Sequence, residues 1–91
     1  MTTVGMGIDI GRVRDNTVIV VASRRAPKSP IHIRGVRILA NTPFSEEPGG
    51  QYYIERANIV KFEPDLVVVD QTDTGGMATV DWLRENVDST V

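Results

Sequence analysis

The chain has 91 residues, no cysteine and a formal net charge of −2. This length predicts one small domain, residues 1–91. The lack of cysteine excludes disulfides, thiolate catalysis and cysteine zinc sites. Because the chain is slightly acidic, any contact with nucleic acid depends on a local basic patch or on metal ions. No apolar run approaches the ~18 residues of a membrane-spanning helix, so we expect a cytoplasmic protein without membrane contact.

The first predicted strand, Val4–Ile10, has two very different faces. Alternation with period two puts four apolar side chains on one face and Gly5, Gly7 and Asp9 on the other. An unpaired buried carboxylate costs several kcal/mol of folding free energy. Asp9 therefore indicates a site at which a positive group meets the strand, with a turn residue or a solvent-facing aspartate as the alternative.

Two more strands are predicted before residue 41. Thr17–Ala22 is rich in β-branched residues, and its short connection to the first strand predicts an antiparallel hairpin. Residues 24–30 hold three cations and two prolines, which predicts an exposed loop. Ile31–Ala40 alternates apolar and polar residues and predicts a strand with a bulge at Gly35.

Two helices and a fourth strand complete the predicted order βββαβα. Helical spacing over Gln51–Phe62 predicts a helix whose packed stripe includes Tyr53, Ala57 and Val60. Leu66–Val69 is a continuous apolar run, which is typical of a strand covered on both faces. The last helix is marked by an apolar stripe with Trp82 beside it: Met77, Val80, Leu83 and Val87.

This order predicts an α/β domain with a mixed sheet. The helical crossover lets the fourth strand lie parallel to the first, giving strand order 3-2-1-4. Asp9 and Asp70 then meet at the carboxyl ends of neighbouring parallel strands, where ligands bind in open α/β sheets. Adjacent carboxylates repel unless they share a proton or a cation, and Mg²⁺ and Mn²⁺ prefer oxygen ligands. We therefore expect Asp9 and Asp70 to be catalytic metal ligands for phosphodiester cleavage.

Two segments resemble one viral protein family. GIDIGRVRDNTVIVVAS and PDLVVVDQTDTGGMATVDWL are similar to blocks of the nuclease domain of phage terminase large subunits. The resemblance implies an RNase H-like fold and a two-metal endonuclease that cuts double-stranded viral DNA at packaging, within a larger terminase assembly. It implies that Asp9 and Asp70 are the first and second metal ligands. Asp15 matches the acid that opens the second strand, and a turn-forming role is its alternative.

The chain also departs from the family pattern. No residue matches the family's third acid, so we expect a partial domain that lacks the last strand and helix. The phosphate-binding motif G-x-x-x-x-G-K-[ST] of the packaging motor does not occur. Asp73 stands where the family more often has glycine, as a replacement metal ligand or as a helix cap. An incomplete sheet would leave apolar surface exposed, which predicts a homo-oligomer or a larger assembly.

Basic side chains near the predicted site are candidate DNA-phosphate contacts, with a solvated loop as the alternative for the last three: Arg12, Arg14, Arg24, Arg25 and Lys28. His32, the only histidine, is expected on the surface. Three other functions stay open. One is a non-catalytic assembly module of RNase H-like fold. The second is a fragment of an actin-like sugar kinase or ATPase, because GIDIG also opens those enzymes. The third is a Holliday-junction resolvase, because the chain resembles those enzymes in its expected fold and its first acid.

Overall fold

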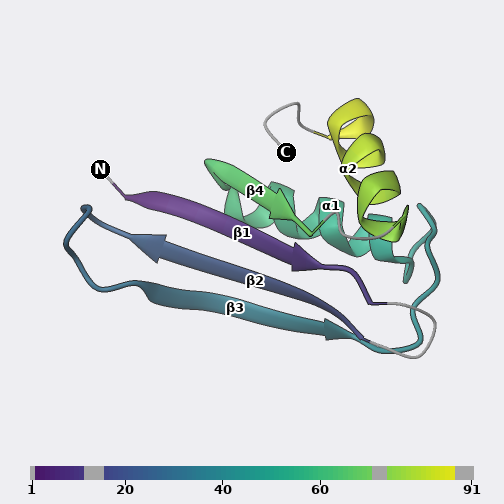
Figure 1. Ribbon diagram of the computed structural model, residues 1–91, viewed down its shortest axis with the longest axis horizontal. Coiled ribbons are helices and arrows are strands. Elements are labelled where there is room, and N and C mark those ends of the chain that lie inside the picture. The colour runs from purple at the N-terminus through teal and green to yellow at the C-terminus, as the bar shows by residue number, and fades with distance from the viewer. Residues whose placement is uncertain (1, 12–15, 71–73, 88–91) are drawn as a thin grey trace.

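The structure is a computed structural model that describes residues 2–11, 16–70 and 74–87. These residues form a four-stranded mixed sheet of order β3-β2-β1-β4 and two helices (Figure 1). The elements are β1 (Thr3–Asp9), β2 (Thr17–Arg24), β3 (His32–Leu39), α1 (Gln51–Phe62), β4 (Leu66–Val69) and α2 (Thr74–Asn86). The predicted α/β class, element order and strand order are confirmed.

β1 connects the antiparallel and parallel parts of the sheet. It pairs antiparallel with β2, so that Asp9 lies opposite Val18. It pairs parallel with β4, so that Gly7 lies opposite Val68. The predicted hairpin and the predicted helical crossover are therefore both present.

A bulge in β3 keeps the apolar residues of this strand on one face. The register against β2 shifts between Ile33 and Gly35, which makes Arg34 an extra residue in the ladder. Without the extra residue, Ile33 and Val36 would point to opposite faces, because side chains alternate along a strand. The predicted bulge at Gly35 is confirmed to within one residue.

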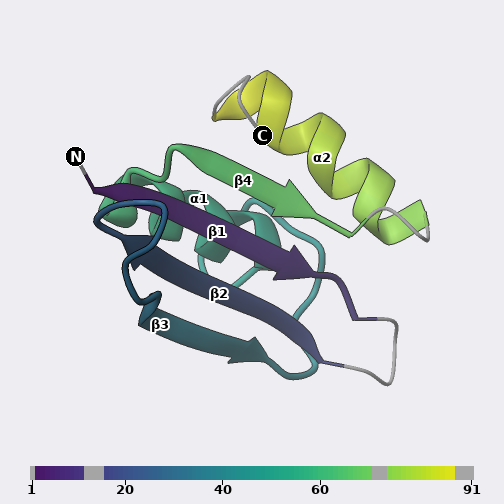
Figure 2. The same cartoon turned by 60° about the vertical axis from the view of Figure 1, so that its left-hand side comes forward.

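The hydrophobic core lies between one face of the sheet and the two helices. In Figure 2, α1 runs behind the sheet and α2 lies beside β4. The buried apolar residues are Met6, Ile8, Ile10, Ile19, Val21, Leu39, Ile59, Val67, Val69, Val80 and Leu83. The predicted stripe of α2 is confirmed at Val80 and Leu83, but Met77 of the same stripe is 53% exposed. Among the described residues, neither helix has the length and apolar character to cross a membrane.

The predicted packed stripe of α1 is wrong. The residues that α1 buries are Gln51, Glu55 and Ile59, whereas Val60 is 69% exposed and Tyr53 is 38% exposed. The buried positions are four residues apart and form one face of the helix. Hydrogen bonds of Gln51 to β2 and to the preceding loop hold this face inward. The polar contacts of Gln51 therefore act together with the packing of Ile59 and Phe62 on the core to orient α1.

The expectation that both faces of β4 are covered is also wrong. Leu66 and Val68 are 55% and 56% exposed, while Val67 and Val69 are buried. The reason is that both helices lie on the same side of β4, so only alternate residues of this strand enter the core. No helix or strand of the described residues covers the other side, which is the open face of the sheet.

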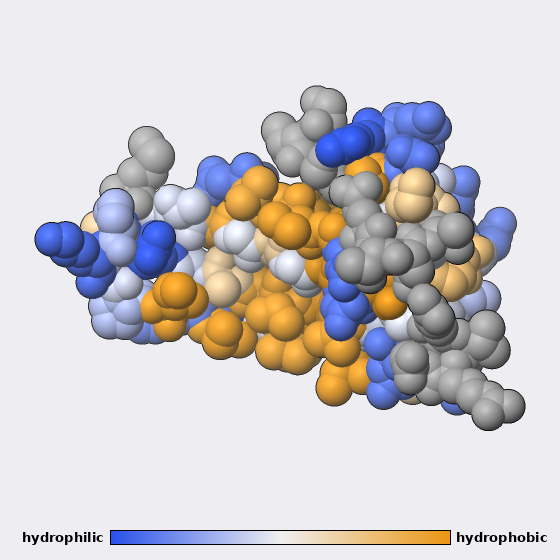
Figure 3. Space-filling view, viewed as in Figure 1, coloured by the Kyte–Doolittle hydropathy of each residue, from blue (hydrophilic) through white to orange (hydrophobic). Residues whose placement is uncertain are grey.

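The open face extends over all four strands. It follows from the pairing register and from side-chain alternation. Figure 3 shows it as a continuous hydrophobic area in the middle of the molecule. The apolar residues and glycines of the open face are Gly5, Gly7, Val18, Val20, Ala22, Ile31, Ile33, Val36, Ile38, Leu66 and Val68.

Candidate functional site

Asp9 and Asp70 lie at the carboxyl ends of neighbouring parallel strands. Ile8 pairs with Val69, and the backbone N–H of Asp70 donates a hydrogen bond of 3.0 Å to the carbonyl oxygen of Ile8. The ladder therefore continues one residue beyond β4, which brings Asp70 next to Asp9. Alternation places both side chains on the open face, away from the helices. Figures 1 and 2 show β1 and β4 ending side by side.

The two carboxylates line one groove on the open face. The groove has a volume of about 500 Å³. Both aspartates are exposed to solvent, so the expectation of a buried carboxylate at Asp9 is wrong, because no helix or strand of the described residues covers this face. A Cβ atom added at Gly7 would meet no other atom within 4 Å, so the strand leaves free space directly beside Asp9. The complete lining is Gly7, Ile8, Asp9, Val18, Val20, Val68 and Asp70. The groove thus has a carboxylate end and an apolar floor.

A third metal ligand is not found within the described parts of the chain. Among those residues, no three side chains of the His, Cys, Asp or Glu type come close enough to share an ion. The other candidate ligands, Asp15 and Asp73, lie outside the described residues, as do Arg12 and Arg14. The structure brings together the two aspartates that the resemblance identifies as metal ligands.

The segment just after β1 is held in place by buried and partly buried hydrogen bonds. The backbone N–H of Gly11 donates to Thr17 Oγ1 at 3.0 Å, and this hydroxyl donates to Gln51 Oε1 at 2.8 Å. Gln51 Nε2 in turn donates to the carbonyl oxygen of Thr42 at 2.8 Å. Gly11 is only two residues beyond Asp9, so this chain of bonds, here called the Thr17–Gln51 clamp, fixes the position of the first carboxylate. Sequence reasoning missed it because Thr17 was interpreted only as a β-branched strand residue.

The cations of the β2–β3 loop do not flank the two carboxylates. Arg24 lies opposite Thr3, at the start of β1, six residues from Asp9. That is about 20 Å along a strand. Antiparallel pairing causes this separation, because the end of β2 returns to the beginning of β1. Arg25 and Lys28 follow in the same exposed loop.

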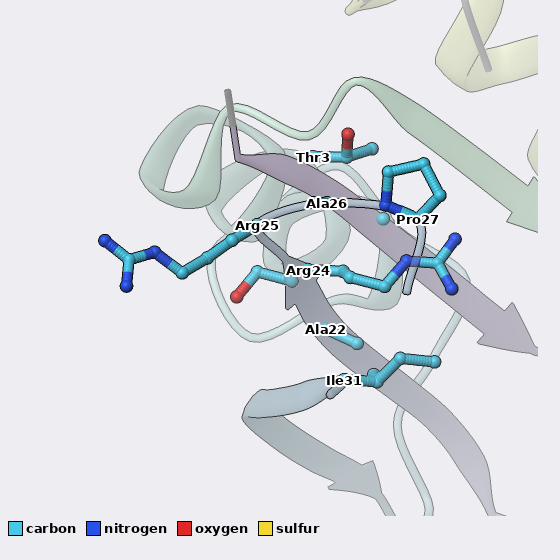
Figure 4. Close-up of a pocket in the computed structure, with 9 residues that line it drawn as sticks. Thr3, Ala22, Arg24, Arg25, Ala26, Pro27 and Ile31 are labelled. Atoms are coloured by element: carbon cyan, nitrogen blue, oxygen red, sulfur yellow. The ribbon is translucent and has the colours of Figure 1, made fainter. Parts of the chain in front are cut away.

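A second groove, of about 310 Å³, is lined by Arg24 and Arg25. In Figure 4, Arg24 runs along the sheet toward Pro27, whereas Arg25 points the opposite way. Gly5, Ala22 and Ile31 of the open face belong to the same lining. The open face therefore has an arginine end and a carboxylate end.

Glu55 is a buried acid that sequence reasoning did not identify. Its side chain is fully buried, and neither carboxylate oxygen has a hydrogen-bond partner. Burial raises the pKa of Glu55 to about 8, so the group is mostly neutral at pH 7. It lies on α1, across the sheet from Asp9 and Asp70, and does not belong to their groove. Its spacing of four residues from Gln51 was the available signal for a shared face.

The other residues considered from the sequence have structural or surface positions. Tyr52 stacks on Trp82 with ring centroids 4.8 Å apart and an interplanar angle of 9°, and Trp82 Nε1 donates to Glu46 Oε1. These rings join α1, α2 and the loop before α1. His32 is exposed on β3, as predicted.

Comparisons of the chain with protein-family models, with curated proteins and with solved structures found no match.

Proposed function

We propose that this chain is a metal-dependent endonuclease domain of RNase H-like fold that hydrolyses DNA phosphodiester bonds in the cytoplasm, as the terminase resemblance implies. The observation that supports it best is the meeting of Asp9 and Asp70 in one open groove. These residues are 61 positions apart in the sequence. A crossover that places two acids side by side at a strand-end edge is typical of a ligand site.

The chain's own residues give this site its chemistry. Asp9 and Asp70 provide carboxylate oxygens, and Mg²⁺ or Mn²⁺ binds in such sites through one or two carboxylates together with substrate phosphate oxygens. A bound divalent ion would neutralise phosphate charge and make its coordinated water more acidic. The free space at Gly7 admits a phosphate group beside Asp9. The Thr17–Gln51 clamp keeps the Asp9 carboxylate in position without contacting substrate.

Thermal melting and plasmid nicking test this proposal together. In the native chain, Mn²⁺ should raise the melting temperature and support nicking of supercoiled DNA. Asp9→Asn and Asp70→Asn should lose both effects, because each removes a charged ligand. Asp81→Asn changes an exposed aspartate of α2 and is the matched control that should keep both. Equal nicking by all four proteins would contradict the proposal, as would a native melting temperature that Mn²⁺ does not change.

A non-catalytic assembly module is the second candidate function. The observation that favours it is the open face, where six apolar side chains are each 55% to 63% exposed. Monomeric proteins rarely expose an apolar patch of this kind without using it. Metal binding at Asp9 and Asp70 without any DNA cleavage would support this function over the nuclease.

A further inference from the structure

We propose that the open face is an interface between two copies of this chain, packed face to face with their strands antiparallel. It develops the second candidate function, the assembly module. In this packing the groove of Asp9 and Asp70 faces the partner, so DNA would reach the two carboxylates only in a separated copy. It depends on three properties of the open face, namely its apolar area, its shape as a sheet surface, and the opposite charges at its two ends.

The first property is the apolar area. The most exposed side chains are Ile31, Ile33, Val36, Ile38, Leu66 and Val68. Together they leave on the order of 500 Å² of apolar surface in water. Two copies would bury about 1,000 Å² between them, which reaches the lower limit for a specific protein interface.

The second property is that β3 directs its apolar residues to the open face. The bulge at Arg34 puts Ile33 and Val36 on the same side of the strand, although they are three residues apart. Without the bulge, one of them would point to the helix side. The bulge therefore gathers apolar side chains on a surface that the described residues leave uncovered. Two such sheets can pack face to face, with side chains interdigitating across about 10 Å.

The third property is the distribution of charge. It favours a second copy of the chain as the partner and sets the orientation of that copy. Asp9 and Asp70 lie at one end of the open face, and Arg24 lies at the other end. A two-fold axis that lies in the plane of the interface, perpendicular to the strands, places the acidic end of each copy against the arginine end of its partner. This contact is isologous and closes at two copies. A two-fold axis along the strands would instead place acid on acid, which repulsion disfavours.

Sedimentation equilibrium of the full 91-residue chain in EDTA is the first test. EDTA removes divalent ions, so the result does not depend on the proposed metal site. We expect a mass of twice the 10.0 kDa of one chain. A strictly monomeric chain would overturn the proposal and assign the open face to another partner.

Matched lysine variants then locate the interface. Val36→Lys places a charge on the open face and should raise the dimer dissociation constant by about a hundredfold, because the change occurs twice across a two-fold interface. Val60→Lys is the control, since Val60 is also exposed but lies on α1. Circular dichroism verifies the fold, and Val68→Lys is a second open-face variant that serves if Val36→Lys unfolds. A folded open-face variant that dimerises like the native chain would indicate pairing through the β3 or β4 edge and would overturn the proposal.

Charge exchange tests the orientation. Arg24→Glu should weaken the dimer about tenfold by placing like charges together at both ends of the interface. Adding Asp9→Lys and Asp70→Lys to Arg24→Glu should restore association, because each end then again faces its opposite charge. An unchanged dimer dissociation constant in the Arg24→Glu variant would contradict the antiparallel arrangement.

Discussion

The backbone N–H of Asp70 donates to the carbonyl oxygen of Ile8 at 3.0 Å, one residue beyond the last residue of β4. This bond extends the parallel ladder far enough to bring the Asp70 side chain level with that of Asp9. Two carboxylates are thus held as neighbours by main-chain pairing. Like charges on adjacent strands destabilise a sheet, and a cation bound between them would offset that effect.

Asp9→Asn should therefore stabilise the chain in EDTA while removing its response to Mn²⁺. We expect a gain of about 0.2–1 kcal/mol in the free energy of unfolding, the size of a cross-strand charge effect. Urea denaturation in low salt measures this gain at a chain concentration low enough to keep the protein monomeric, so that Arg24 of a second copy does not contribute. The gain should shrink as added salt screens the repulsion. A loss of stability in EDTA would mean that Asp9 has a structural role instead.

The strand order could be predicted because it follows from local rules. A short connection after β1 predicts a hairpin, and a helix between β3 and β4 predicts a parallel return. The same hairpin already implies that Arg24 lies far from Asp9, since β2 runs back toward the start of β1. The predicted topology therefore already argues against a position of Arg24, Arg25 and Lys28 beside Asp9 and Asp70.

Thr17→Val should destabilise the chain by about 1–3 kcal/mol, because it leaves the buried Gln51 Oε1 and the Gly11 N–H without their partner. Valine preserves the shape and the β propensity of the residue, so the loss reports the hydrogen bonds. The matched control is Thr42→Val, which removes only an exposed bond to the carbonyl oxygen of Ala40. Urea denaturation compares them, and equal effects of the two variants would argue against a structural role for the Thr17–Gln51 clamp.

Replacing Gly7 or Gly50 by alanine should change the stability of the chain in opposite directions. A Cβ at Gly7 meets nothing within 4 Å, so Gly7→Ala should be neutral or raise stability by up to about 1 kcal/mol through the strand propensity of the new residue. A Cβ at Gly50 would overlap the backbone carbonyl of Ser45, so Gly50→Ala should cost about 1–3 kcal/mol. Thermal melting distinguishes the two variants. If Gly50→Ala melts like the native chain, the loop before α1 does not pack as described.

The open face and the rotation of α1 could not be predicted from residue patterns alone. An apolar run such as Leu66–Val69 indicates a strand, but it does not show how many layers cover that strand. For α1, the inward face includes Gln51 and Glu55, which hydropathy assigns to solvent. Burial there depends on the hydrogen bonds that Gln51 makes to residues distant in the sequence. These contacts join residues that are far apart in the sequence, so no local residue pattern indicates them.

Glu55 should make the chain less stable as the pH rises from about 5 to 8. The folded-state pKa of about 8 lies above the ordinary value of 4.5, so the folded chain binds more protons than the unfolded chain between these values. Stability then falls with increasing pH, by on the order of a few kcal/mol across the window. Below pH 4.5 both states are protonated at this residue, and its ionisation no longer lowers stability.

Glu55→Gln tests this assignment because glutamine has the same shape and does not ionise. Urea denaturation at a series of pH values should show the native chain losing stability above pH 5, while the Glu55→Gln variant keeps a flatter profile. Glu85→Gln, at an exposed position of α2, is the control and should follow the native profile. Parallel profiles for the native chain and Glu55→Gln would show that Glu55 reaches water or a cation when the protein is folded.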